Sequence, residues 1–421
     1  MTLRRAGKTL GIYAVILLVM LTVGLLLLEG AAFLPQDRIV ANYAEGFLQF
    51  ETESYSPKIL NVWRSDARLN NRSELQILQY SLYMDARQYP DAVLSNPGYV
   101  TDVSATGLAE MRDAALAGTA PNNHYVRYWQ GFRAVVRALL TVCHYGDMRR
   151  LLMWLYCGLA ALCAIELTRR TRGREAPVAF ALSLMLFNPV VVSTSFQFGC
   201  CYLIAMAGML AVSLLHGRVR PARVLFGVAI ATQFFDYYTA PSLTLVYPLL
   251  MALVCAVFSP EAEQEPLWRI AVRCIVAWMA GYVLMWGCKL LLVTLFTEHN
   301  GLKNGLGSLA GWLTGSAVKE KATVGQALEA AFSVLGMLSM AVSIAYSVLT
   351  GLWNLRKGPD RTALGRAALC AAMGLISLVW IAVAAQPTAA HAYFQYRTLG
   401  GLIFALMLAP VFLAVSPRAQ G

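Results

Sequence analysis

Residues 10–31 read LGIYAVILLVMLTVGLLLLEGA, and this stretch decides the class of fold. It holds a single charged side chain, Glu29. At about 1.5 Å per residue, a helix of this length crosses the roughly 30 Å hydrocarbon core of a bilayer. The run is longer than a typical signal-peptide core, although small residues follow at 30–32. We therefore expect an uncleaved first membrane span.

Similar apolar blocks recur along the chain. Hydrophobic residues make up 58% of the sequence and charged residues only 14%, with a mean hydropathy of +0.56. A soluble chain carries about 25% charged residues. The sequence therefore predicts an all-α, polytopic transmembrane bundle of about ten spans. The expected spans are 10–31, 151–168, 176–194, 199–216, 222–236, 240–258, 270–296, 329–352, 364–385 and 398–416.

The charges near the span ends predict an orientation. The two termini and every second connection between spans would lie on the same side of the membrane. Together they carry 17 of the 34 basic residues and only six acidic residues, an excess equal to the whole net charge of +11. Lys and Arg accumulate in cytoplasmic connections. Both termini are therefore expected to be cytoplasmic. A nucleic-acid partner is not expected, because it would require a basic patch on a soluble face.

Three parts follow from this layout: a cytoplasmic N-terminus with span one (1–31), an extracytoplasmic loop (32–150) and a nine-span bundle (151–421). The bundle includes a second outer segment at 297–328, whose Gly, Asn and Ser content favours a mobile loop with a short interfacial turn around Leu309–Leu313.

The large loop has helical signals. A capping-box pattern at Ser73–Gln76 predicts a helix to about Asp85, and 104–117 predicts another. In 125–145 the apolar residues have helical spacing with three arginines between them, which favours an interfacial helix on the outer surface.

Several classes of function are disfavoured. The sequence has no Gly-rich phosphate loop, HExxH motif or serine nucleophile elbow, which argues against an ATP-driven pump or a zinc protease. Few charges lie at membrane depth, which argues against an ion channel. The nine cysteines show no CxxC pair, so the sequence predicts neither a disulfide framework nor a metal site. A divalent metal cofactor has no support in the sequence.

Two carboxylates in the first outer loop are candidate catalytic bases. Asp37 follows span one almost at once, and Asp66 lies further along the same loop. A carboxylate there can take a proton from a hydroxyl. The alternative for Asp37 is a helix N-cap or a solvated pair with Arg38.

Five further residues are candidates for substrate binding. Arg127 and Arg397 can each bind an anion, and Lys289 is a basic residue at membrane depth. Each has a structural alternative: an interfacial belt for the arginines, and snorkelling or an ion pair for Lys289. Asp236 either binds a basic group such as Arg397 or caps a turn, and His391 is one of four outward histidines.

The layout resembles the GT-C superfamily of membrane glycosyltransferases. More closely, four motifs resemble a little-characterised bacterial family whose members tend to accompany surface-polysaccharide genes. These motifs are LPQDRI (34–39), YVRYWQGFRAVVRALL (125–140), FFDYYTAP (234–241) and HAYFQYR (391–397).

The resemblance implies a transferase in the bacterial cytoplasmic membrane that moves a sugar from a polyprenyl-phosphate donor to a cell-envelope polysaccharide or glycolipid at the outer face. It places the catalytic carboxylate at Asp37, although many GT-C members have paired acids where Arg38 follows here, so Asp66 stays an alternative. Arg127, Lys289 and Arg397 would hold the lipid phosphate. Two other readings remain open: a transporter of lipid-linked or polysaccharide intermediates, and a non-catalytic membrane subunit whose loop docks a partner.

Overall fold

The computed structural model describes residues 3–53, 56–57, 68–101, 105–236, 238–258, 265–316 and 320–414. In this part of the chain nearly all regular structure is helical, as predicted. The strands are the two-residue β1 (Pro97–Gly98) and β2 (Asn123–His124), which pair antiparallel. Seven of the described helical segments are long and apolar enough to cross a membrane, consistent with an integral membrane protein.

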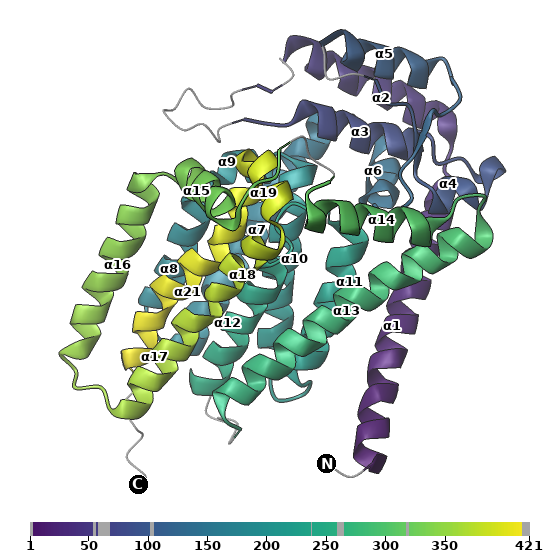
Figure 1. The fold of residues 1–421 in the computed structure, drawn as a ribbon. Helices are drawn as coiled ribbons and strands as arrows, with labels where there is room; N and C mark the ends of the chain where they lie inside the picture. The colour runs from purple at the N-terminus through teal and green to yellow at the C-terminus, as the bar shows by residue number, and fades with distance from the viewer. Residues whose placement is uncertain are drawn as a thin grey trace.

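A layer of short elements, which we call the cap, lies over one end of the helix bundle (Figure 1). Its helices include the predicted helix at 104–117, which is confirmed as α5. Besides β1 and β2, the cap contains α2 (Gln36–Thr52), α3 (Asn71–Leu82), the 3₁₀-helix η1 (Ala86–Gln88), α4 (Asp91–Leu94), α5 (Ala105–Leu116) and α6 (Phe132–Leu140).

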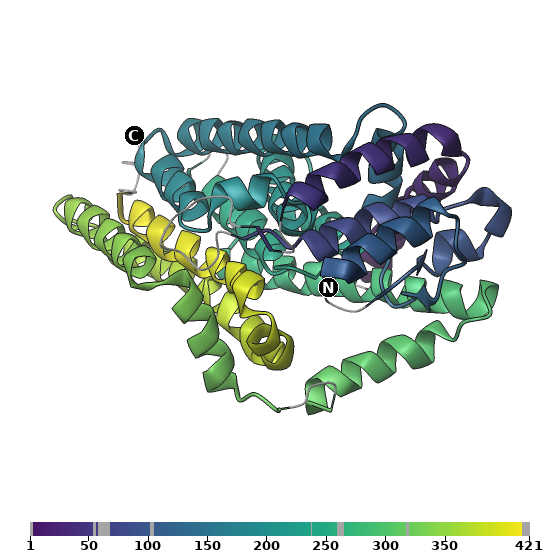
Figure 2. The same cartoon turned by 90° about the horizontal axis from the view of Figure 1, so that it is seen from above.

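The bundle contains the remaining helices. Seen from above in Figure 2, the cap covers the part nearer α1 and α13, and the C-terminal helices lie beside it. The elements are α1 (Leu3–Ala32), α7 (Tyr145–Thr171), α8 (Glu175–Met185), α9 (Pro189–Ser193), α10 (Phe196–Leu214), α11 (Pro221–Phe235), α12 (Leu243–Phe258), α13 (Leu267–Phe296), α14 (Gly301–Thr314), α15 (Val324–Leu335), α16 (Met337–Leu355), α17 (Arg361–Met373), α18 (Leu375–Val383), α19 (Ala385–Ala390), α20 (Ala392–Gln395), the 3₁₀-helix η2 (Tyr396–Leu399), α21 (Gly400–Leu408) and the 3₁₀-helix η3 (Ala409–Ala414).

Two of the predicted spans are interrupted. The block 176–194 divides into α8, which ends at Met185, and α9, which begins after Asn188; the φ of Asn188 is 56° and its side chain caps α9. The block 329–352 divides into α15 and α16 at Gly336, where φ is 79°. Both are left-handed conformations that a continuous helix does not contain. The predicted spans 222–236 and 240–258 correspond to α11 and α12, of 15 and 16 residues. The count of ten spans stays a prediction.

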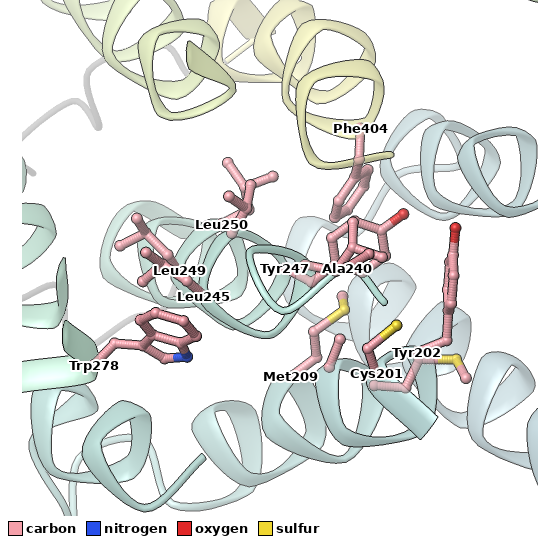
Figure 3. Close-up of a cluster of buried hydrophobic side chains, with 14 of the residues drawn as sticks. Cys201, Tyr202, Met209, Ala240, Leu245, Tyr247, Leu249, Leu250, Trp278 and Phe404 are labelled. Atoms are coloured by element: carbon pink, nitrogen blue, oxygen red, sulfur yellow. The ribbon is translucent and has the colours of Figure 1, made fainter. Parts of the chain in front are cut away.

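The bundle core is built around α12. Every residue from Leu243 to Ala256 is buried, as expected for a helix that is apolar on all sides. Tyr247 packs against Phe404 of α21 with ring centroids 5.0 Å apart. On the other side, Trp278 of α13 donates a hydrogen bond from Nε1 to Thr244 Oγ1 at 3.1 Å. Figure 3 shows Trp278, Tyr247 and Phe404 among the buried side chains of this core. α10, α13 and α21 all pack against this buried helix.

The structure differs in detail from three local predictions for the loops. α3 begins after Asn70, whose Oδ1 accepts a hydrogen bond from the Ser73 backbone N–H, so Ser73 is not the cap residue. The segment 297–328 contains the 14-residue helix α14, about four turns long, and the start of α15 rather than a mobile loop. The predicted helix at 125–145 is shorter, Phe132–Leu140, and its two arginines are buried, while its place at a membrane interface stays a prediction.

Two buried arginines explain the position of α6. Arg133 donates hydrogen bonds to the carbonyl oxygens of Ala92 and Val93 at 3.1 and 2.9 Å. Arg137 donates to the carbonyl oxygens of Ala31 at 2.7 Å and Ser81 at 2.8 Å. Cations stabilise the unpaired carbonyls at helix C-termini. These guanidinium groups therefore join α6 to the ends of α1, α3 and α4.

A close approach of helices fixes Gly131. A Cβ atom added at Gly131 would lie 2.1 Å from Phe234 Cε1, and its backbone N–H donates to the Phe234 carbonyl at 2.7 Å. We expect Gly131→Ala to destabilise the protein by about 1–3 kcal/mol, because the ring has to move in a packed region. Gly158→Ala is the matched control, since nothing lies within 4 Å of its added Cβ. Thermal unfolding in nanodiscs measures the midpoints of both variants. A Gly131→Ala midpoint equal to that of Gly158→Ala would contradict the packing argument.

Candidate functional site

A cavity of about 580 Å³ lies where α2 ends and α7 begins. We call it the junction cavity. Its residues come from the cap, from the start of α7 and from the turn before α10, so it lies at the boundary between cap and bundle. The lining residues are Gln49, Glu53, Pro57, Leu69, His144, Gly146, Arg149, Arg150 and Thr194.

A bidentate ion pair between Arg149 and Glu53 forms one wall of the junction cavity. Arg149 Nη1 lies 2.6 Å from Glu53 Oε1, and Nη2 lies 3.1 Å from Oε2. Asn71 and Gln49 donate further hydrogen bonds to the same carboxylate. Burial raises the pKa of Glu53, but the hydrogen bonds and charge of Arg149 outweigh burial and hold that pKa below its usual range. Glu53 is therefore an anchor for Arg149 rather than a proton acceptor.

His144 and Arg150 supply the less constrained groups. His144 Nδ1 accepts a hydrogen bond from the Gly146 N–H at 3.2 Å, which makes His144 the N-cap of α7. Its Nε2 lies 3.2 Å from a carboxylate oxygen of Asp147. Arg150 pairs with the same Asp147, but its side chain is 68% exposed. The cavity thus combines two guanidinium groups and an imidazole with an apolar wall.

A second cavity, of about 440 Å³, lies inside the cap, and we call it the cap cavity. Amide and phenol side chains dominate its wall, which suits recognition of hydroxyl-rich ligands by hydrogen bonds and ring contacts. No carboxylate is among its described lining residues. They are Gln76, Tyr80, Val100, Asn122, Asn123, Tyr125 and Arg127.

Arg127, predicted to bind an anion, lines the cap cavity. Its guanidinium lies 4.6 Å from the centre of the Tyr125 ring, and Nη1 donates a hydrogen bond to Ser308 Oγ of α14 at 3.1 Å. Trp286 Nε1 donates to the Arg127 carbonyl at 2.9 Å. α13 and α14 therefore hold Arg127 at the cavity wall.

The two predicted bases have different outcomes. Asp37 is exposed in the first turn of α2 and lines neither cavity. It is about 24 Å from Glu53 along α2, at 1.5 Å per residue. Asp66 lies outside the described residues. In the sequence it stands three positions before Leu69, which lines the junction cavity.

Three other predicted binding residues line neither cavity. Asp236 is buried, and its Oδ2 accepts a hydrogen bond from the Thr239 N–H at 3.2 Å, so it caps a turn. Lys289 is fully buried in α13, where Nζ donates to the Leu94 carbonyl of the cap. His391 stacks on Phe394 with ring centroids 5.3 Å apart, and burial lowers the pKa of His391.

Arg397 is the most unusual of the predicted residues. It is fully buried, and its guanidinium lies 4.3 Å from the centre of the Phe198 ring. Nη1 donates to the Tyr393 carbonyl at 3.3 Å, but Nε and Nη2 have no hydrogen-bond partner among the residues that the structure describes. The hydroxyl groups of Tyr156 and Tyr202, whose rings are 6.3 Å apart, also have none. Buried donors without partners are rare in proteins and suggest a bound group.

Sequence reasoning missed Glu53, Arg149 and Arg150. One signal was available: Arg149 and Arg150 stand at the predicted outer end of a span, where basic residues are depleted. Their partner Glu53 lies 96 positions earlier, and no sequence pattern connects the two. One group of described residues is close enough to hold a metal ion, namely Asp91, His124 and His299, and it lies outside both cavities.

Comparison of the chain with protein-family models, curated proteins and solved structures finds no match. The site is therefore interpreted from its own chemistry.

Proposed function

We propose that this protein is a membrane glycosyltransferase that moves a sugar from a polyprenyl-phosphate donor to a cell-envelope polysaccharide or glycolipid. The junction cavity supports this proposal most directly. Arg149 and Arg150 line it near the N-terminus of α7, a helix apolar enough to cross a membrane. Guanidinium groups bind phosphate oxygens, and the neighbouring apolar helix surface suits a polyprenyl chain.

The chemistry needs a leaving-group site and a base. The bond from the sugar C1 to the phosphate oxygen breaks, and C1 forms a new bond to the acceptor oxygen. The acceptor hydroxyl gives its proton to a carboxylate, and polyprenyl phosphate leaves with its negative charge. Arg149 and Arg150 would stabilise that charge. Asp66 is our preferred base, because Asp37 is about 24 Å from Glu53 along α2.

The cap cavity supplies a complementary proposal for the saccharide. Its amide side chains and the Tyr80 and Tyr125 rings suit hydrogen bonds and ring contacts with sugar hydroxyls and faces. α3 connects the two cavities. Its residue Asn71 contacts Glu53 of the junction cavity, and its residue Gln76 lines the cap cavity. At 1.5 Å per residue these two positions are only about 7.5 Å apart along α3.

We infer that the cap faces the outside of the bacterial cytoplasmic membrane. The start of α1 and the turn between α16 and α17 lie at the end of the bundle away from the cap (Figure 1). Their sequences, with residues 4–8 and 356–366, belong to the connections that hold the positive excess. The positive-inside tendency then puts this end in the cytoplasm.

A transfer assay tests the proposal. Purified protein in nanodiscs receives radiolabelled polyprenyl-phosphate sugars and cell-envelope acceptor. We expect transfer by the wild type, at least about a tenfold loss of kcat/KM in Arg150→Ala, and near-complete loss in Asp66→Asn. Asp37→Asn should retain activity. Loss in Asp37→Asn with full activity in Asp66→Asn would reverse the assignment of the base.

The control is Arg87→Ala. Arg87 is 85% exposed in the cap, pairs with Asp85 and lines neither cavity, so its variant should transfer normally. Lipid-linked sugar that crosses liposomes without being consumed would replace the transferase with a transporter. Inactive protein that recovers activity with a copurified subunit would favour the non-catalytic reading.

A further inference from the structure

Asp91, His124 and His299 meet although they are far apart in the sequence. Asp91 opens α4, His124 lies in β2, and His299 stands in the turn between α13 and α14. Figure 1 shows α4 beside that turn. One ligand atom from each residue lies within 4.8 Å of the other two, and all three residues are half-buried.

The spacing matches what a small metal ion requires. One Asp91 oxygen lies 3.4 Å from His124 Nδ1, and the other lies 3.6 Å from His299 Nε2. Bonds of about 2.0–2.1 Å to a tetrahedral Zn²⁺ separate neighbouring ligand atoms by roughly 3.3–3.4 Å. The two imidazole rings lie 4.4 Å apart between centroids. Small side-chain rotations would therefore complete the geometry.

The ligand types favour zinc over the common hard cations. Mg²⁺ and Ca²⁺ prefer sets made of oxygen atoms, whereas two imidazoles and one carboxylate suit Zn²⁺. Catalytic zinc sites commonly have three such protein ligands and a fourth position open to water. The half-buried location here leaves room for a water ligand.

The backbone around the three residues is held in place independently of any ion. Arg133 and Lys289 donate hydrogen bonds to the carbonyl oxygens of α4, which fixes the helix that carries Asp91. Ser95 Oγ donates to the Asp91 carbonyl at 2.8 Å, which holds the same turn of backbone. His124 Nδ1 lies 3.0 Å from Ser95 Oγ, and an ion bound at Nδ1 would replace this contact.

We propose that Asp91, His124 and His299 form a Zn²⁺ site that joins the cap to the turn between α13 and α14. The site lies outside both cavities, so it does not depend on the proposed transferase activity. An ion bound there cross-links segments that are more than 170 residues apart in the sequence. It thereby limits the motion of the cap relative to the bundle.

Metal binding to the full-length protein in nanodiscs tests the site. After treatment with a chelator, the protein is dialysed against Zn²⁺, and bound zinc is measured by mass spectrometry. We expect about one ion per chain, and a tetrahedral absorption spectrum when Co²⁺ replaces Zn²⁺. His299→Ala and Asp91→Asn should each weaken binding at least about tenfold and remove the Co²⁺ spectrum.

His144→Ala is the matched control. His144 lies at the start of α7 with two carboxylates nearby, from Glu45 and Asp147, but it belongs to no group of described residues that could hold a metal ion. This variant should bind zinc as the wild type does. Unfolding midpoints measured in chelator show that the variants are folded. Addition of Zn²⁺ should raise the midpoints of the wild type and of His144→Ala, but not those of His299→Ala and Asp91→Asn. No bound zinc in the wild type, or equal binding by His299→Ala, would overturn the proposal.

Discussion

Glu74→Leu is expected to abolish the folded protein. Glu74 is fully buried in α3, and its carboxylate accepts four hydrogen bonds. Tyr145 Oη and Ser195 Oγ donate at 2.7 and 2.6 Å, and the backbone N–H groups of Phe196 and Gln197 donate at 3.2 and 3.0 Å. A carboxylate of the cap thus binds the N-terminus of α10, where backbone donors are unpaired and the helix dipole favours an anion.

The magnitude follows from the number of donors. Each buried donor left without a partner costs about 1–3 kcal/mol. With four donors affected, the loss is comparable to the total stability of roughly 5–15 kcal/mol of a typical protein. Glu74→Gln keeps an acceptor oxygen of the same shape, so it should fold with a lowered unfolding midpoint.

Yield of monodisperse protein and thermal unfolding in nanodiscs measure this effect. Glu110 is the control, because it is an exposed glutamate of the cap helix α5. Glu110→Leu and Glu110→Gln should both resemble the wild type. A Glu74→Leu protein that is purified in normal yield and melts with the wild type would show that the cap does not depend on this carboxylate.

The class of fold could be predicted because membrane spans depend mainly on local composition. Blocks such as 10–31 and 270–296 correspond to α1 and α13. The breaks at Asn188 and Gly336 could not be predicted, because an apolar run with one such residue reads as continuous. Whether it divides depends on the helices packed around it.

The loop was harder to interpret than the bundle because its polar residues bind partners that are distant in sequence. The residues Ser73 to Gln76 match the capping-box pattern, yet Asn70 is the cap residue and the carboxylate of Glu74 binds the start of α10. Arg133 and Arg137 suggested an interfacial helix, but they are buried because carbonyl oxygens of other elements accept their hydrogen bonds. Such pairings depend on tertiary structure.

The candidate site was predicted only in part, because its residues also pair with partners that are distant in the sequence. Arg127 was selected as a cation among aromatic residues, and it does line a cavity. Lys289 was selected for its depth, but a cap carbonyl accepts its hydrogen bond, a partner no sequence pattern indicates. The Glu53–Arg149 pair and the three possible zinc ligands each join separate segments, so their residues look unremarkable one at a time.

Arg397→Met is expected to make the protein more stable and, at the same time, inactive. The guanidinium of Arg397 is fully buried, and no carboxylate pairs with it among the described residues. Its Nε and Nη2 lack hydrogen-bond partners. The rings of Phe198 and Tyr396, at 4.3 and 5.0 Å, offset part of the cost of burying this charge. Replacing buried ionic groups by apolar side chains often stabilises a protein by about 1–4 kcal/mol.

A costly buried cation is expected where function needs it. If Arg397 holds an anion such as the lipid phosphate, polyprenyl phosphate should raise the unfolding midpoint of the wild type but not that of Arg397→Met. The variant should also lose transfer. Arg133→Met is the contrasting variant, because Arg133 is equally buried but donates to two carbonyl oxygens, which would be left without a donor. It should melt below the wild type.

The two midpoints separate a functional guanidinium from a structural one. A functional Arg397 predicts a rise for Arg397→Met and a fall for Arg133→Met in ligand-free nanodiscs. If both variants melt below the wild type, Arg397 stabilises the packing of η2 against α10. The assignment of Arg397 as an anion-binding residue is then wrong. A rise in stability with full transfer activity would instead separate Arg397 from the phosphate and leave Arg149 and Arg150 as the cations that bind it.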